Sequence, residues 1–264
     1  MGESSVMILR RVIGHFQKQE WTAIFLDFLI VVLGVVIGVQ VNSWWAGLSD
    51  AHREMAYLAA LQEDFSLVIA ELEGDAAQYE GIANSMALLL DQSRKAAPDA
   101  SLAALNAAAG QLISMEGTPI VSDTYSNLTG SGDLAIIKSQ AVKNSLSVFF
   151  AQADTIKLVA NTHEMQLVNV FQPYIINNLD YPGMTANDRR DKGLTAFEPE
   201  RILAVLPTAE FRNVVAVKWD IVTDLRNNIL QALDDARDVE AVLAAELEKR
   251  SPAQSVPKKG DGAN

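Results

Sequence analysis

The chain has 264 residues, 49% of them hydrophobic, which is enough for one domain of ordinary size with a sizeable core. Its formal charge is −12, and an acidic surface is repelled by phosphate backbones, which argues against nucleic acid as a partner. The absence of cysteine excludes disulfides, thiol catalysis and thiolate metal sites.

Residues 1–20 combine basic and apolar positions at helical spacing. Arg10, Arg11 and Lys18 lie among the polar positions. The pattern predicts a cytoplasmic amphipathic helix on the membrane surface. Its apolar positions are Val6, Ile8, Leu9, Val12, Ile13 and Phe16.

Residues 21–45 are predicted to form a transmembrane helix. The stretch Phe28–Val39 is apolar without interruption, and Trp21 and Trp44 are 23 residues apart. At the rise of a helix this separation is about 34 Å, which matches a hydrocarbon slab of about 30 Å. Trp21, Trp44 and Trp45 are therefore predicted to be interfacial anchors. Asp27 lies near one end, where an ionisable group costs less than at the centre.

A cleaved signal peptide is the alternative interpretation of these residues. Val41-Asn42-Ser43 resembles a weak cleavage site, but the positive region would be long and Trp44-Trp45 would follow the cut directly. A retained anchor is preferred. Three Lys or Arg residues precede the span, and only Arg53 lies in the 20 residues after Trp45. This asymmetry predicts a cytoplasmic N-terminus and an extracytoplasmic domain.

One face of the predicted span collects small and polar residues. Gly34 and Gly38 form a GxxxG pair, a pattern that lets two helix backbones approach closely. At about 100° per residue, Asp27, Gly34, Gly38 and Asn42 fall within an arc of about 80°. The face predicts a contact with a second copy or with another membrane protein. Chance is the alternative, since glycine is common in such helices.

Residues 46–250 are predicted to form a helical extracytoplasmic domain. Its first helix is expected from Ser49 to Ala96, continuing the membrane helix after a short break near Gly47. Its apolar stripe comprises Met55, Leu58, Leu61, Phe65, Val68, Leu72, Ala76, Tyr79, Ile82, Met86 and Leu89. Asp99 or Ser101 is expected to cap a shorter helix that runs to about Ser114.

A second long helix is expected from Asp133 to Phe171, after a short helix that stops at Gly130-Ser131-Gly132. Pro173 is expected to kink or interrupt it. Its expected core residues are Leu134, Ile137, Val142, Leu146, Phe149, Phe150, Ile156, Val159 and Leu167.

The segment Asp180–Pro207 is irregular, and its residues 188–192 form a solvated charge run. Thr208 is then expected to cap the last long helix, from Glu210 to Lys249. Its stripe is Phe211, Val215, Val222, Leu225, Ile229, Leu233, Ala236, Val239, Leu243 and Leu247. Residues 251–264 are rich in Pro, Lys and Gly and are predicted to be a disordered tail.

Three long amphipathic helices cannot each bury an apolar stripe alone. No segment of useful length has the period of a strand. The predicted fold is all-α, with an N-terminal transmembrane helix followed by an elongated antiparallel helical bundle similar to a coiled coil.

No motif predicts catalysis, a cofactor or a metal site. The histidines His15 and His52 lie on opposite sides of the predicted membrane, and His163 lacks the second histidine of a zinc-protease helix. A pair of distant carboxylates such as Asp123 and Asp133 is not singled out by its spacing. The segment Tyr174–Tyr181 mixes aromatic and amide groups, for which packing at a bundle end is preferred over a ligand pocket.

Two stretches together carry a resemblance to a known family. Ile30–Trp45, followed by Tyr57-Leu58 and Leu61, and Thr124–Ile137 are similar to an uncharacterised bacterial family of single-pass, membrane-anchored helical proteins. The matching positions are Gly38, Gln40, Asn42 and Trp44, then Tyr125, Leu128, Gly132 and Leu134. The resemblance covers about half the chain and implies a membrane-anchored helical protein. For a bacterial protein, the charge asymmetry then predicts the inner membrane as its location, with a cytoplasmic N-terminus and a periplasmic C-terminal domain. The resemblance implies no activity, and Asp180–Pro207 has no counterpart in it.

Three functions are consistent with these observations, in order of preference. The first is a non-catalytic interaction or accessory protein that associates with itself or with other membrane chains, with the lipid bilayer as a further partner. The second is a sensory or ligand-binding bundle that signals through a partner. The third, a periplasmic enzyme, is the least favoured because no nucleophile–base or metal-ligand spacing is present.

Overall fold

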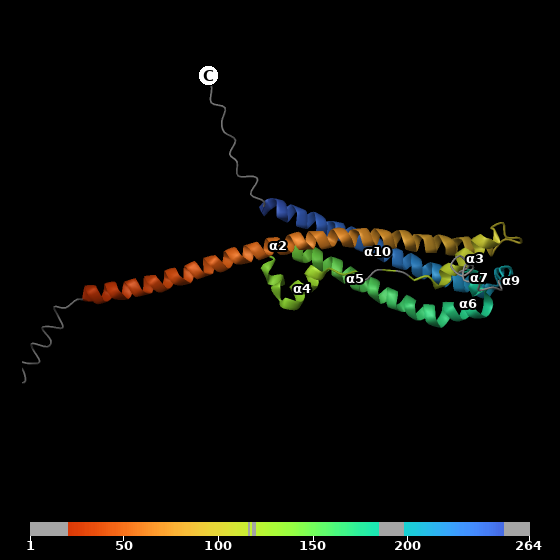
Figure 1. The fold of residues 1–264 in the computed structure, drawn as a ribbon, viewed down its shortest axis with the longest axis horizontal. Helices are drawn as coiled ribbons and strands as arrows, with labels where there is room; N and C mark the ends of the chain where they lie inside the picture. Colours follow the sequence, from red (N-terminus) through yellow and green to blue (C-terminus); the bar gives the residue numbers. More distant parts are fainter. Residues whose placement is uncertain (1–20, 116, 118–119, 185–197, 251–264) are drawn as a thin grey trace, which may run out of the picture. The chain divides into compact units, whose positions relative to one another are not determined.

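The computed structural model describes residues 21–115, 117, 120–184 and 198–250 (Figure 1). Every regular element in this part of the chain is a helix, which confirms the all-α class. The predicted amphipathic segment 1–20, the charge run 188–192 and the tail 251–264 lie outside the described residues. The chain divides into two compact units, Met1–Glu54 and Met55–Asn264.

The longest helix, α2, spans Trp21–Gln92 and contributes to both units. The predicted break near Gly47 is wrong, because α2 is continuous there. A glycine inside a helix costs only about 1 kcal/mol relative to alanine, and no proline accompanies Gly47 to remove a backbone hydrogen bond. In the first unit, the apolar side chains of α2 from Phe28 to Leu48 are exposed.

In the second unit, α2 packs with α5 (Gln140–Gln166) and α10 (Ala209–Arg250). One apolar cluster joins the three helices, and Figure 1 shows them side by side. The stripe predicted for α2 is confirmed from Leu58 to Leu89, since every member of it in that range is buried. The stripe of α10 is buried from Phe211 to Leu243, as predicted.

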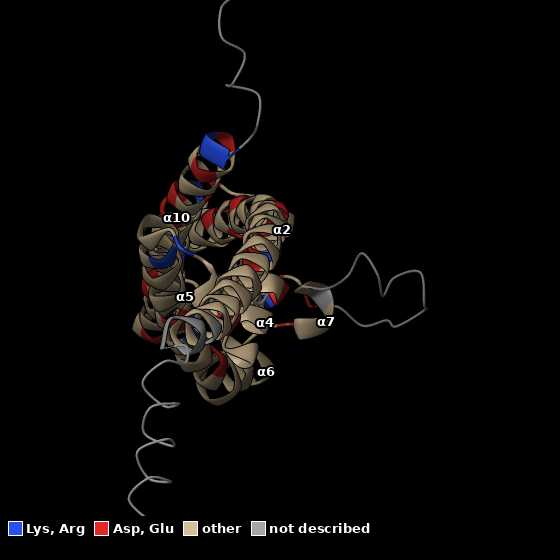
Figure 2. Ribbon diagram, turned by 90° about the vertical axis from the view of Figure 1, so that its left-hand side faces the viewer, with Lys and Arg blue, Asp and Glu red and all other residues tan. Residues whose placement is uncertain are grey.

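Polar contacts set the register of these helices. On α10, Arg226 lies 3.3 Å from Glu80 of α2, and Arg237 lies 2.7 Å from Glu73, so the residue order is opposite along the two helices. Gln152 of α5 donates to the side-chain oxygen of Asn228 on α10 over 3.1 Å. Acidic residues recur along α10 (Figure 2), and none of them is among its buried residues. The acidic residues of α10 thus lie away from the core.

Side-chain caps fix where several helices begin. Ser101 caps α3 (Leu102–Gly110), and Thr208 caps α10 by accepting from the amide of Phe211, as the sequence predicted. The helix expected over Asp133–Phe171 is interrupted, because Ile137 has an extended backbone and Ser139 caps the new helix α5. Only a 3₁₀ turn, η2 (Asp133–Ile136), precedes the interruption.

The turn before η2 requires glycine. Gly132 ends α4 (Asp123–Ser131) with a φ of 78°, in the left-handed region where a Cβ is unfavourable. The stop predicted at Gly130-Ser131-Gly132 therefore falls at the right place. Ser122 caps the other end of α4 by accepting from the amide of Tyr125.

A π-helical turn, η3 (Leu167–Phe171), follows α5 and leads into α6 (Gln172–Asn178). Pro173 lacks an amide proton, and its ring would clash with the carbonyl of Asn169 in a regular helix. The wider π turn accommodates this conflict without ending the helical segment. The predicted disturbance at Pro173 is thus present, as a π turn immediately before it.

A second apolar cluster closes one end of the second unit. It joins α3, α6, α9 (Arg201–Val205) and the start of α10 to the C-terminal end of α2. Tyr174 is buried there against Phe211, with ring centroids 6.3 Å apart. The short helix α7 (Tyr181–Met184) packs beside this cluster. The packing interpretation of Tyr174–Tyr181 is therefore supported over a ligand pocket.

Candidate functional site

The first candidate surface is the predicted packing face on α2. Gly34, Gly38 and Asn42 lie on this helix and are exposed. A Cβ placed on either glycine would meet no atom within 4 Å, so the described chain does not cover this face. Asp27 and Trp21 also belong to α2, but their side chains lie outside what the structure describes.

The apolar part of α2 is long enough to cross a membrane. Among the described residues, one helix meets this requirement by length and composition, and none of its most apolar window is buried. Trp44 and Trp45 are exposed beside each other, with ring centroids 6.0 Å apart in an edge-to-face arrangement. A contiguous exposed apolar surface of this kind marks contact with lipid or with another protein.

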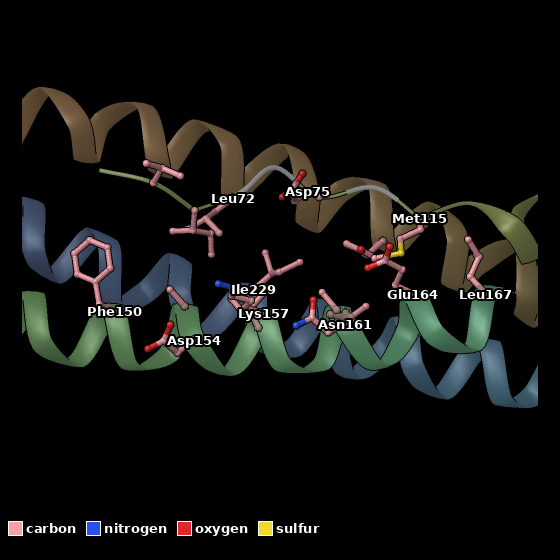
Figure 3. A pocket seen from close by; sticks show the side chains of 18 residues that line it. Leu72, Asp75, Met115, Phe150, Asp154, Lys157, Asn161, Glu164, Leu167 and Ile229 are labelled. Atoms are coloured by element: carbon pink, nitrogen blue, oxygen red, sulfur yellow. The ribbon is translucent and has the colours of Figure 1, made fainter. Parts of the chain in front are cut away.

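The second candidate site is a cavity of about 730 Å³ in the second unit. Residues of α2, α5 and α10 form its walls together with Met115, Gly117, Ile120 and Val121. Figure 3 shows Phe150 at one end and Met115, Glu164 and Leu167 at the other. Its volume lies within the range of about 300–1,000 Å³ that is typical of small-molecule sites.

The third candidate is a buried pair, Lys218 on α10 and His163 on α5. The Lys218 Nζ lies 2.7 Å from the His163 Nε2 and donates over 2.7 Å to the carbonyl of Ser114. The ring of Phe171 lies 5.2 Å from the same Nζ, as measured to its centroid, which adds a cation–π contact. Both side chains are completely buried, and no carboxylate in the described part of the chain pairs with Lys218.

Burial without a carboxylate changes the proton affinity of both groups. Desolvation lowers the pKa of Lys218 to about 7. Desolvation, and then the positive charge of Lys218, lower the pKa of His163 to about 4. When Lys218 is an ammonium, which only donates, the Nε2 of His163 accepts and the ring proton resides on Nδ1. That Nδ1 is buried and has no partner among the described residues.

The remaining sequence candidates have local structural contacts. The Tyr57 hydroxyl donates to Asp133 over 3.0 Å. Asp123 begins α4 and Asp133 follows its end, so the helix holds these two carboxylates roughly 13 Å apart at the standard rise. His52 bonds within its own helix, from Nδ1 to the carbonyl of Leu48 over 2.9 Å. The structure therefore does not bring Asp123 and Asp133 into one site.

Sequence reasoning treated His163 as a surface or packing residue and did not single out Lys218. A signal was present: Lys218 lies three residues after Val215 and four before Val222, inside the apolar stripe of α10. A lysine at such a position must bury its amine, unless the helix turns the apolar stripe away from the core.

Comparison with known proteins adds no relative: no family model, no curated protein and no solved structure matches the chain.

Proposed function

We propose that this chain is a non-catalytic, membrane-anchored interaction protein. The observation that carries the proposal is the first part of α2, where an exposed apolar stretch bears an uncovered Gly34/Gly38 face. Outside lipid, this stretch would leave its side chains in water at a cost of roughly 1.5–3 kcal/mol for each large one. Inside lipid, small residues allow close helix–helix contact.

The proposed location is the bacterial inner membrane. The excess of basic residues before the span supports a cytoplasmic N-terminus and hence a periplasmic domain, and the family resemblance supports a bacterial membrane-anchored protein. The domain is proposed to be an elongated antiparallel bundle. The Arg226–Glu80 and Arg237–Glu73 ion pairs support that arrangement, because they follow opposite residue order on α2 and α10.

The orientation is tested with introduced cysteines, since the native chain has none to interfere. In intact cells, a membrane-impermeant maleimide is expected to label Ser147→Cys, an exposed position on α5, and to leave Ser4→Cys unlabelled. After cell lysis both variants should react. Labelling of Ser4→Cys in intact cells would reverse the proposed topology. Recovery of the chain from the soluble fraction without detergent would rule out the anchor itself.

The packing face is tested by filling it. Gly34→Leu with Gly38→Leu is expected to weaken association at least tenfold, a change of about 1.4 kcal/mol, because bulky side chains prevent the close backbone contact that small residues allow. Mass measurement in mild detergent, with identification of co-purifying chains, provides the readout. Val36→Leu, about 200° away from Gly34, is the matched control and should change nothing. Equal association of the glycine variant and the control would contradict a role for this face.

The cavity in the second unit favours a second candidate function, ligand binding. Ligand binding does not depend on the membrane face, so failure of the glycine experiment would not argue against it. The chemistry of its walls is specific enough to define a ligand class.

A further inference from the structure

The cavity is an unusual feature for a helical core. Protein interiors pack to crystal-like density and leave few voids larger than a water molecule, because unfilled space forfeits dispersion contacts. Here a space of about 730 Å³, partly open to solvent, lies between α2, α5 and α10. The surrounding side chains are apolar at the floor: Leu72, Tyr79, Phe150, Ile156, Leu225 and Ile229. A ligand with an apolar body would restore the missing contacts.

The rim of the cavity carries charges of predominantly one sign. Asp75 of α2 and Asp154 and Glu164 of α5 contribute three carboxylates, and Lys157 contributes the single ammonium in the described lining. Figure 3 shows Asp75 on α2 across the opening from Lys157 and Asn161 on α5. The net charge of this lining is therefore −2, which repels carboxylates and phosphates and attracts cations.

Asp154, Lys157 and Glu164 take part in no side-chain ion pair in the part of the chain that the structure describes. Asp154 and Lys157 are three residues apart on one helix, yet they do not pair. The carboxylates of Asp154 and Glu164 are thus available to a ligand at the mouth of an apolar space.

We propose that this cavity binds a small organic cation with an apolar body, of the protonated arylalkylamine class. The body lies on the floor between α2, α5 and α10, and the ammonium lies at one of the two rim carboxylates, Asp154 or Glu164, which are about 15 Å apart along α5. The apolar part of a fatty acid or an anionic lipid fits the floor, but its negative head group is repelled by the rim carboxylates. This inference goes beyond the interaction role and uses no residue of the membrane face.

The test uses the full-length protein in lipid nanodiscs and three probes with one apolar body. These are 4-phenylbutylamine as the cation, 4-phenylbutanol as the neutral analogue and 4-phenylbutyrate as the anion. Titration followed by ligand-observed NMR is expected to give saturable binding of the amine, at least fivefold tighter than the alcohol and with the anion weakest. Equal binding of the three, preference for the anion, or no saturation by the amine below about 10 mM would overturn the proposal.

Variants separate the charge from the cavity. Asp154→Asn with Glu164→Gln is expected to weaken the amine at least fivefold and to leave the alcohol unchanged, whereas Lys157→Gln should tighten the amine. Asp238→Asn, which changes an exposed carboxylate on α10 outside the lining, is the matched control.

The cavity itself is tested by filling it. Ala160→Phe should abolish binding of both the amine and the alcohol. Ala151→Phe, at an exposed position on the same helix, is its control. Undiminished amine binding in the double variant would refute the assignment.

Discussion

Replacement of Phe65 by alanine is expected to lower the free energy of unfolding of the second unit by about 3–5 kcal/mol. Phe65 is fully buried at the centre of the cluster that joins α2, α5 and α10. Its ring lies edge-to-face with Phe149, at 4.9 Å and 67°, and with Phe150 at 6.3 Å. Truncation removes these aromatic contacts together with the buried area and leaves a cavity that rigid neighbouring helices cannot close.

The measurement is urea unfolding of the full-length chain in mild detergent, followed by circular dichroism. Leu67→Ala is the matched control, because Leu67 lies on the same helix two residues later and its side chain is 63% exposed. The control should shift the free energy of unfolding by no more than about 0.5 kcal/mol. Similar losses in the two variants would mean that the described face of α2 is not the one that packs.

The second large effect is on the pH dependence of stability, through Lys218. The folded state holds the pKa of this amine at about 7, against an ordinary value of 10.5, because burial disfavours its charge. Between pH 7 and pH 10.5 the unfolded chain binds more protons than the folded chain, so the free energy of unfolding rises with pH in this range. The contribution approaches about 1.4 kcal/mol per pH unit and amounts to a few kcal/mol in total. Below about pH 7 this contribution is flat.

Lys218→Met is expected to abolish that rise, and the difference in unfolding free energy between wild type and variant should change most from pH 7 to pH 10. Lys143→Met, on α5 and only half-buried, should retain the wild-type profile. His163 adds a separate rise between about pH 4 and its ordinary value of 6.5, since its folded pKa is also lowered. Parallel profiles for wild type and Lys218→Met above pH 7 would show that the amine is not desolvated as the structure describes.

The core of the long helices was predictable from the sequence because burial follows the helical period. Leu58, Phe65 and Leu72 on α2, and Val215 and Val222 on α10, recur at spacings that place them on one face. The caps Ser101 and Thr208 were predictable for a similar reason, since a hydroxyl just before an apolar-periodic run satisfies free amides at a helix start.

Other features depend on contacts between distant residues and were not predictable. The cavity needs the relative spacing of three helices, which no local pattern encodes. The contact between Lys218 and His163 joins residues 55 positions apart, so neither residue predicts the other. The break at Ile137–Ser139 was missed because its apolar residues continue the helical period even though the backbone there is extended. The packing face at Gly34 and Gly38 stays a prediction, since no described residue of this chain covers it.

The π turn at Leu167–Phe171 has a consequence for heptad-based comparison of sequences. Counting in sevens from Val142 gives Phe149, Ile156 and His163, which lie in or against the core, and then Val170. In the structure Val170 is 40% exposed and Phe171 is completely buried. The turn thus inserts one residue into the count, which rotates the faces of α6 by about 100°. An alignment scored on an unbroken heptad would place α6 one position out of phase, whereas a single-residue gap at η3 restores the register.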